Sequence, residues 1–212
     1  TYMVIDDRRD HSIRIPRPDL SAKLGTPNAC NKCHTDKNVQ WAANNFTKWY
    51  GKKLPAQKTY GETAAAIAAF NPQSETLLYE LLQASQYSSI ARATVMEQYG
   101  QLSSARVKDK LLQQLQLPEP LLRLNALKAL GNYPPQEWQA QATPLLYDAV
   151  LAVRNEAMNL LAPVSPTLAA ADANQWRLVM NKYLALQEEM SHRPEGFFNR
   201  ALLMASSGNI SG

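Results

Sequence analysis

Apolar residues recur at helical spacing along most of this chain, and no stretch alternates apolar and polar residues as a half-buried strand does. A first amphipathic segment covers residues 38–50, and Gly51 follows it as a candidate C-cap. Residues 1–36 differ, because the prolines within Ile15-Pro16-Arg17-Pro18 push their predecessors out of the helical region. We therefore predict an irregular segment over 1–36, a helix over 38–50 and an all-α fold beyond residue 61.

An internal repeat marks the middle of the chain. Three segments align on Arg92, Arg123 and Arg154, which are each 31 residues apart. In every copy, apolar residues stand three, four and seven places after the arginine, which is one face of a helix. With the amphipathic segments between them, these copies form helix pairs that cannot bury an apolar face alone. The spacing therefore predicts an α-α superhelical solenoid.

The repeated pattern Pro/Leu-x-x-Arg-x-x-Ala-x-x-x-Leu-Gly resembles short HEAT repeats over residues 74–165, with chance similarity between amphipathic helices as the alternative. The string over residues 193–205 resembles the first helix of a tetratricopeptide (TPR) unit. We expect three regions: an N-terminal segment over 1–55, HEAT-like repeats over 60–165, and a truncated TPR-like helix pair over 166–212.

Composition narrows the class of protein. The 212 residues include only two cysteines, which excludes a small disulfide-stapled fold. No run of about 18 apolar residues occurs, so we expect no membrane span. The net charge of +4 combines a surplus of six positive charges over residues 1–60 with a deficit of two over 61–212. The basic residues are scattered and form no basic helix face, so we expect no nucleic-acid partner. The chain begins without a methionine or signal segment, which suggests part of a longer protein.

One pentapeptide carries the candidate chemistry. Both cysteines lie in Cys30-Asn31-Lys32-Cys33-His34, which is the Cys-x-x-Cys-His attachment signature of c-type haem. Two thiols at this spacing form thioethers to the two vinyl groups of one porphyrin, and the adjacent imidazole becomes the proximal ligand of the iron. The sequence thus predicts a covalent haem c on Cys30 and Cys33, with His34 on the iron, and residues 1–55 as a c-type haem-binding segment.

Three other interpretations of the motif remain open. Zinc would take the same three side chains and a fourth ligand, His11 or His192, but the second half of a zinc motif is missing. A thioredoxin-like dithiol needs a strand before the motif, and none is predicted. Short motifs also arise by coincidence. Haem is the interpretation that we favour.

The second axial ligand is predicted to be His11, which precedes His34 by 23 residues in an extended stretch that can fold back. The methionines lie mostly on apolar helix faces and are better explained as core. Basic residues such as Arg17 and Lys37 are candidates to meet the haem propionates. Four aromatic residues of the first helix are expected either to wall the haem or to anchor that helix: Trp41, Phe46, Trp49 and Tyr50.

The segments 10–18 and 24–34 together resemble the last haem-binding segment of bacterial multihaem cytochromes c, in which helical repeats often follow. The resemblance is specific over about residues 8–50. It implies an exported, periplasmic redox protein whose partner is another redox protein or a neighbouring haem domain of the parent chain. It also implies that a histidine placed like His11 ligates a haem, sometimes one that is bound by a different motif.

These observations favour an electron-transfer module in which the helical repeats present a docking surface. One alternative is an interaction scaffold whose haem segment is structural or unoccupied. Another is part of a multihaem reductase, which would need an open iron position and nearby proton donors. The chain shows no paired carboxylates at suggestive spacing, so we favour a function without catalysis in this chain.

Overall fold

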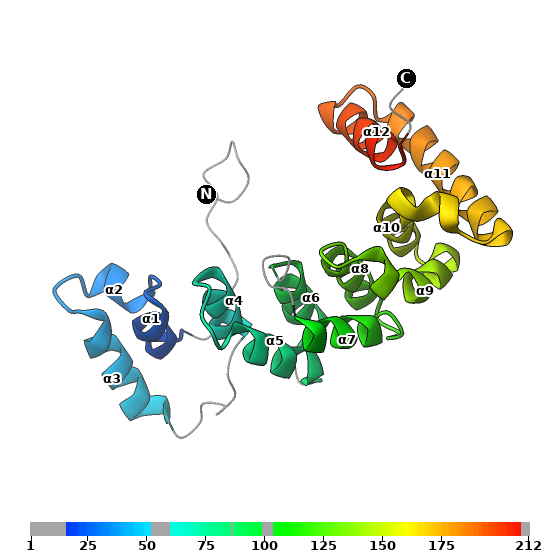
Figure 1. Cartoon of the computed structure of the whole chain (residues 1–212). Coiled ribbons are helices and arrows are strands. Elements are labelled where there is room, and N and C mark those ends of the chain that lie inside the picture. Colours follow the sequence, from blue (N-terminus) through cyan, green and yellow to red (C-terminus); the bar gives the residue numbers. More distant parts are fainter. Residues whose placement is uncertain (1–15, 52–59, 86, 99–103, 209–212) are drawn as a thin grey trace. The chain divides into compact units, whose positions relative to one another are not determined.

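The computed structural model describes residues 16–51, 60–85, 87–98 and 104–208 (Figure 1). Over these residues the chain forms α-helices and short 3₁₀ helices and no strand, which confirms the predicted all-α class. It divides into two compact units, unit 1 over Thr1–Lys58 and unit 2 over Thr59–Gly212. No helix in the described ranges is long and apolar enough to cross a bilayer.

Unit 1 corrects the prediction of an irregular segment over 1–36. Helix α1 (Pro18–Leu24) and the single turn α2 (Cys30–Cys33) both lie within it. Pro18 occupies the first turn of α1, where its missing N–H costs nothing. Gly25 ends the helix at φ 69°, a left-handed conformation that favours glycine, and its N–H bonds the Ser21 carbonyl. Residues that break a longer helix therefore start and stop a short one here.

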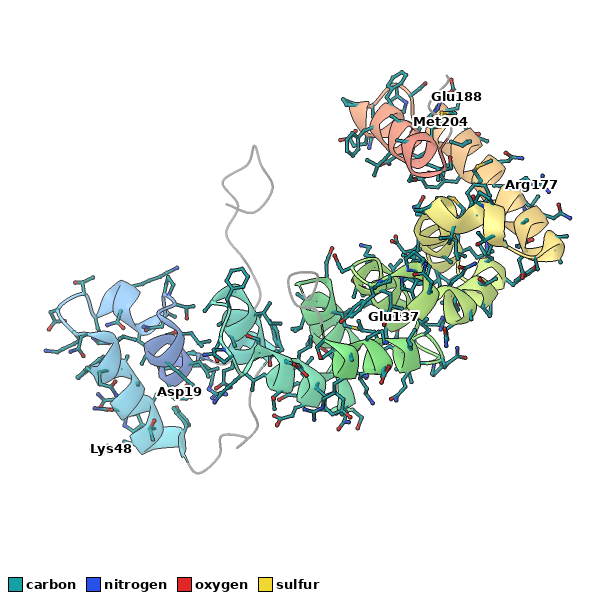
Figure 2. All side chains as sticks on the ribbon, viewed as in Figure 1. Asp19, Lys48, Glu137, Arg177, Glu188 and Met204 are labelled. Atoms are coloured by element: carbon teal, nitrogen blue, oxygen red, sulfur yellow. The ribbon has the colours of Figure 1, made fainter. Side chains whose placement is uncertain are left out.

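Helix α3 (Val39–Tyr50) confirms the helix predicted over 38–50. Asn38 begins it as N-cap, since its side chain accepts a hydrogen bond of 2.8 Å from the Trp41 N–H. Gly51 takes the C-cap position in a right-handed conformation, with φ −53°, and its N–H bonds the Thr47 carbonyl. Helix α3 packs against α1. Lys48 lies on its exposed side (Figure 2).

Unit 2 contains the remaining helices, and the prediction of helix beyond residue 61 is confirmed over its described residues. In chain order they are α4 (Tyr60–Ala68), α5 (Ser74–Gln83), α6 (Ser89–Gln98), α7 (Ala105–Gln114), α8 (Pro120–Leu130), η3 (Pro135–Glu137), α9 (Gln139–Ala142), η4 (Thr143–Tyr147), α10 (Leu151–Leu161), η5 (Ala162–Thr167), α11 (Ala170–Glu189) and α12 (Pro194–Ser206).

Each helix of unit 2 packs against helices that are close to it along the chain. Helix α6 contacts α4, α5 and α8, helix α8 contacts α7 and α10, and α11 contacts α10 and α12. One continuous apolar core runs through these contacts. Its largest fully buried side chains are Ile67, Leu78, Leu82, Met96, Leu111, Leu115, Leu122, Leu127, Leu130, Leu146 and Met158.

The three arginines spaced 31 residues apart make similar contacts. Arg92 donates to the Leu82 carbonyl at 2.9 Å. Arg123 donates to the carbonyls of Leu117 and Pro118, both at 2.8 Å. Arg154 donates to the carbonyls of Asp148 and Ala149, which stand six and five residues before it, as Leu117 and Pro118 do before Arg123. Arg123 and Arg154 thus satisfy backbone oxygens of the connection that precedes their own helices, whereas the Leu82 carbonyl that Arg92 meets belongs to the last turn of α5.

Candidate functional site

The three side chains of the motif lie at one turn of unit 1. Cys30 and Cys33 begin and end α2, three residues apart, which places them on the same side of the turn. Both are free thiols, Cys30 half-buried and Cys33 exposed. His34 is the C-cap of α2, and its N–H bonds the Cys30 carbonyl at 2.9 Å. Its imidazole is exposed. Local backbone hydrogen bonding therefore holds all three groups at one accessible place.

One predicted aromatic residue lies beside the motif. The rings of His34 and Trp41 are 4.9 Å apart between centroids and tilted by 51°, so the first turn of α3 supports the imidazole. Phe46, which is 8% exposed, anchors α3 instead. Trp49 and Tyr50 are 64% and 50% exposed and follow Trp41 by two helical turns or more. Of the two roles expected for the four aromatics, walling a haem or anchoring the helix, Phe46 takes the second, and Trp41 is the one that lies beside the motif.

Two asparagines that sequence reasoning missed shape the turn. Asn28 accepts a hydrogen bond from the Asn31 N–H at 3.1 Å, and its amide donates to the Asn31 side chain at 2.8 Å. Asn31 donates in turn to the Lys37 carbonyl at 2.7 Å. Asn31 therefore ties α2 to the loop that carries His34. The signal was present, because an asparagine just before a helix is a common cap.

Arg17 and Lys37, which were expected near the propionates, both have carboxylate partners. Arg17 donates two hydrogen bonds to Asp19, at 2.9 and 2.7 Å, and these bonds hold the pKa of Asp19 below its usual value. Lys37 pairs with Asp36 at 2.8 Å. A surface hollow of about 560 Å³ lies beside α2, lined in part by Asn31, Lys32 and Lys37. Lys37, which lines this hollow, therefore already has a carboxylate partner within the chain.

The predicted second ligand, His11, lies outside the described residues and stays a prediction. His192 is exposed in the connection between α11 and α12, with its Nδ1 3.3 Å from the Glu189 carbonyl oxygen. Within the ranges that the structure describes, no three His, Cys, Asp or Glu side chains gather so as to hold a metal ion. The zinc alternative therefore gains no support from the described residues.

The donor set at α2 fits a covalently attached haem. Two thiols that are in no disulfide stand one helical turn apart, and the imidazole after them reaches solvent. Attachment needs reduced thiols, and axial ligation needs an accessible ring nitrogen.

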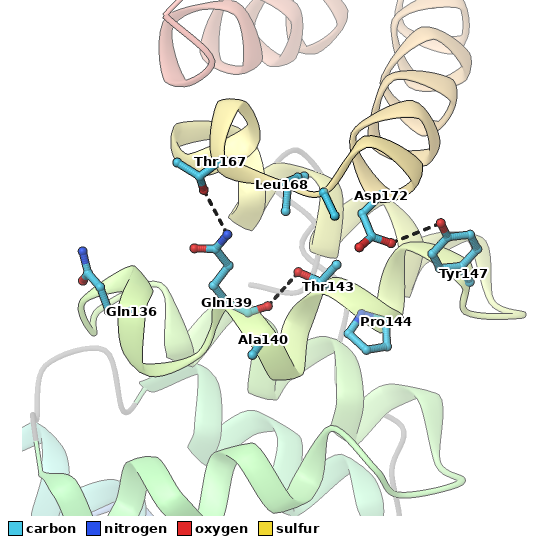
Figure 3. Close-up of a pocket in the computed structure, with 10 residues that line it drawn as sticks. Gln136, Gln139, Ala140, Thr143, Pro144, Tyr147, Thr167, Leu168 and Asp172 are labelled. Atoms are coloured by element: carbon cyan, nitrogen blue, oxygen red, sulfur yellow. Dashed lines mark hydrogen bonds between the residues drawn. The ribbon is translucent and has the colours of Figure 1, made fainter.

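Unit 2 has a separate hollow of about 740 Å³ between α9, η4 and the start of α11 (Figure 3). Its polar side chains bond one another. Gln139 donates to the Thr167 hydroxyl at 3.0 Å, and the Tyr147 hydroxyl donates to Asp172 at 3.2 Å (Figure 3). These pairs stabilise the contact between η5, α11 and the preceding helices.

No family model, no curated protein and no solved structure matches this chain. The class of protein is therefore inferred from the residues of the motif and their arrangement.

Proposed function

We propose that this chain is part of a c-type cytochrome that transfers electrons through one haem attached to Cys30 and Cys33, with His34 as the proximal iron ligand. The observation that carries the proposal is the turn α2, which presents two free thiols and an exposed imidazole within five residues. When bound, the haem supplies reversible one-electron chemistry.

The residues of the turn have distinct tasks. Cys30 and Cys33 would hold the haem through two thioethers, each formed by addition of an S–H across one vinyl double bond, so that no oxidant or leaving group would be needed. His34 donates the lone pair of a neutral ring nitrogen. Trp41 packs against that ring and limits its rotation. Asn31 holds the loop on the far side of His34 through the Lys37 carbonyl.

The helices of unit 2 are proposed to be HEAT-like repeats followed by a TPR-like helix pair, stacked as a solenoid. The equivalent contacts of Arg123 and Arg154 with the connection before each helix support this assignment, and Arg92 contacts the end of the preceding helix. A solenoid offers a long surface for partners. The exposed apolar side chains of α12 suit such contacts: Phe197, Phe198 and Leu202.

The proposal places the protein in the bacterial periplasm, where haem is attached to exported chains. Its electron donor or acceptor is then another redox protein or a neighbouring haem domain. The surplus of positive charge over residues 1–60 favours an acidic partner surface at the haem segment.

The test is covalent attachment. The chain is produced in a periplasm that contains the haem-attachment machinery, and the purified protein is stained for haem on a denaturing gel and weighed by mass spectrometry. We expect a stained band and a mass increase of one haem. The double variant Cys30→Ala, Cys33→Ala should lose both, because no thioether can form.

Lys32→Ala is the matched control, since it alters the motif at a variable and exposed position and should keep the haem. A wild-type chain without covalent haem under these conditions would refute the proposal. Equal staining of the double variant would also refute attachment at these two cysteines.

A further inference from the structure

Arg154 differs from the two arginines before it in the contact that it makes with the next part of the chain. Arg92 donates to the Gln114 side chain at 2.7 Å, and Arg123 pairs with Asp148, 25 residues further on. Arg154 makes the equivalent backbone contacts, but no described side chain accepts a hydrogen bond from it. The acceptor position that Asp148 fills for Arg123 is thus open at Arg154.

A cavity lies at this position. It has a volume of about 330 Å³ and is formed by the end of η4 and by α10 and α11, with Arg154 and Lys182 among its lining residues. Asp148 also lines it, but this carboxylate is held by Arg123 at 2.7 and 2.9 Å. Lys182 is exposed and has no ion-pair partner in the described part of the chain. The cavity therefore holds two cations that donate no hydrogen bond to a described carboxylate, although the charge of Asp148 also acts on Arg154.

The rim of the same cavity is apolar. Leu151 and Leu178 line it and are 50% and 49% exposed. A small free carboxylate would use the two cations and leave these side chains in water. A peptide with an acidic side chain beside an apolar one would use both, since burial of apolar area contributes about 25 cal/mol per Å².

We propose that this cavity binds an aspartate or glutamate side chain from an acidic, leucine-bearing segment of a partner protein. The carboxylate of that side chain contacts Arg154 and Lys182 in the way that Asp148 contacts Arg123. The partner's carboxylate completes the set of arginine contacts, and its apolar neighbour covers Leu151 and Leu178. This binding site belongs to unit 2 and does not depend on haem attachment at Cys30 and Cys33.

The experiment measures fluorescence anisotropy of a labelled eight-residue peptide with blocked ends, Glu at its centre and Leu on both sides, added to the full-length chain. The reference peptide has Gln in place of Glu. We expect the Glu peptide to bind about tenfold more tightly, because a charge-assisted contact is about twice as strong as a neutral one. The preference should shrink as salt is added.

Lys182→Gln should weaken the Glu peptide about fivefold and leave the Gln peptide unchanged. Arg177→Gln is the matched control, because Arg177 lies on the same helix (Figure 2) and does not line the cavity. Loss of this distant charge should leave the affinity for the Glu peptide almost unchanged. Circular dichroism confirms that both variants keep their helices. Lys182 makes no described contact, so loss of folding does not confuse the result.

Equal binding of the two peptides, or equal effects of the two variants, would overturn the proposal. Displacement of the Glu peptide by acetate or succinate at the peptide's own concentration would overturn the assignment to a protein segment, because it would show that the rim contributes nothing. The Cys30→Ala, Cys33→Ala variant should bind the peptide normally, so a failure here is distinguishable from a failure of haem attachment.

Discussion

At the scale of single residues, Arg123 and Asp148 form the most buried ion pair in the described part of the chain. Their side chains are 12% and 7% exposed. The guanidinium meets both carboxylate oxygens, at 2.7 and 2.9 Å, and its remaining nitrogen donates to two backbone carbonyls. Removing one partner of such a pair leaves the other charge buried, which costs more than the pair itself contributes.

Asp148→Asn should lower the free energy of unfolding by about 3 kcal/mol at pH 7. Burial by itself raises the pKa of Asp148, but hydrogen bonds from Arg123 and the Val150 N–H, with the charges of Arg123 and Arg154, outweigh it and set the pKa below its usual value. Because the pKa is lower in the folded state, its stabilising contribution is complete above about pH 4 and is lost as the pH falls further. Urea unfolding of both proteins from pH 7 to pH 2 measures this.

The difference between the wild type and the variant should narrow below about pH 4, because the wild-type carboxyl then takes up a proton. Asp109→Asn is the control in the same unit, since Asp109 is 70% exposed and 3.9 Å from its lysine, and it should change stability little at any pH. A difference for Asp148→Asn that stayed constant down to pH 2 would contradict this account of the pair.

Sequence reasoning can group single residues where their chemistry depends on near neighbours. Cys30, Cys33 and His34 could be grouped because their spacing within five residues is a local property, and the structure keeps them on one turn. The partner of Arg123 could not be predicted, because Asp148 lies 25 residues away and reaches it only through packing of α8 against α10. The 31-residue spacing of the arginines could be seen in the sequence, but the groups that accept their hydrogen bonds could not.

At the scale of elements, helix α1 shows why prolines and glycines are ambiguous. Pro18 and Gly25 interrupt any long helix, which favoured an irregular segment. The same residues are a favourable first turn and a left-handed cap for a helix of seven residues. Helix α3 was predictable because Asn38, a polar cap, is followed by three turns of amphipathic pattern. The two helices differ in the length of their periodic stretch, which is 12 residues in α3 and only seven in α1, too short for a clear helical pattern.

Helix α8 is the element on which the core of unit 2 depends most directly, because it packs against α6, α7 and α10. Leu127 on this helix is fully buried. Leu127→Ala should therefore lower the free energy of unfolding by about 3 kcal/mol, which combines the lost transfer free energy with the cost of the cavity. Thermal and urea unfolding followed by far-ultraviolet circular dichroism measure the change.

Leu202→Ala is the matched control, because it removes the same atoms from α12 at a position that is 58% exposed. Its effect should stay within about 0.5 kcal/mol. If both variants lost the same stability, burial in the contact of α8 with its neighbours would not be the cause, and the continuous core described for unit 2 would be wrong.

At the scale of the whole molecule, the two units bury very different amounts of apolar surface. In the described part of unit 1, one large side chain, Phe46, lies in the core, with small residues such as Ala42 and Ala43 around it. Unit 2 has a continuous core of large side chains. A domain of about 60 residues with a small apolar core is marginally stable, and such domains often depend on a metal, a disulfide or another link. A covalently held haem at α2 would supply that link to residues 16–51.

Hydrogen exchange should therefore separate the units. In the Cys30→Ala, Cys33→Ala variant, amides of α1 and α3 should exchange close to the rate of an open chain, whereas those of α8 and α10 stay protected. With haem attached, amides of α1 and α3 should exchange about tenfold more slowly or better, because a group that binds only the folded form stabilises it. Mass-spectrometric exchange on peptides from both units measures this, with α8 as internal reference. Equal protection of α1 and α8 in the variant would show that unit 1 folds on its own packing, and haem would then have no structural part in it.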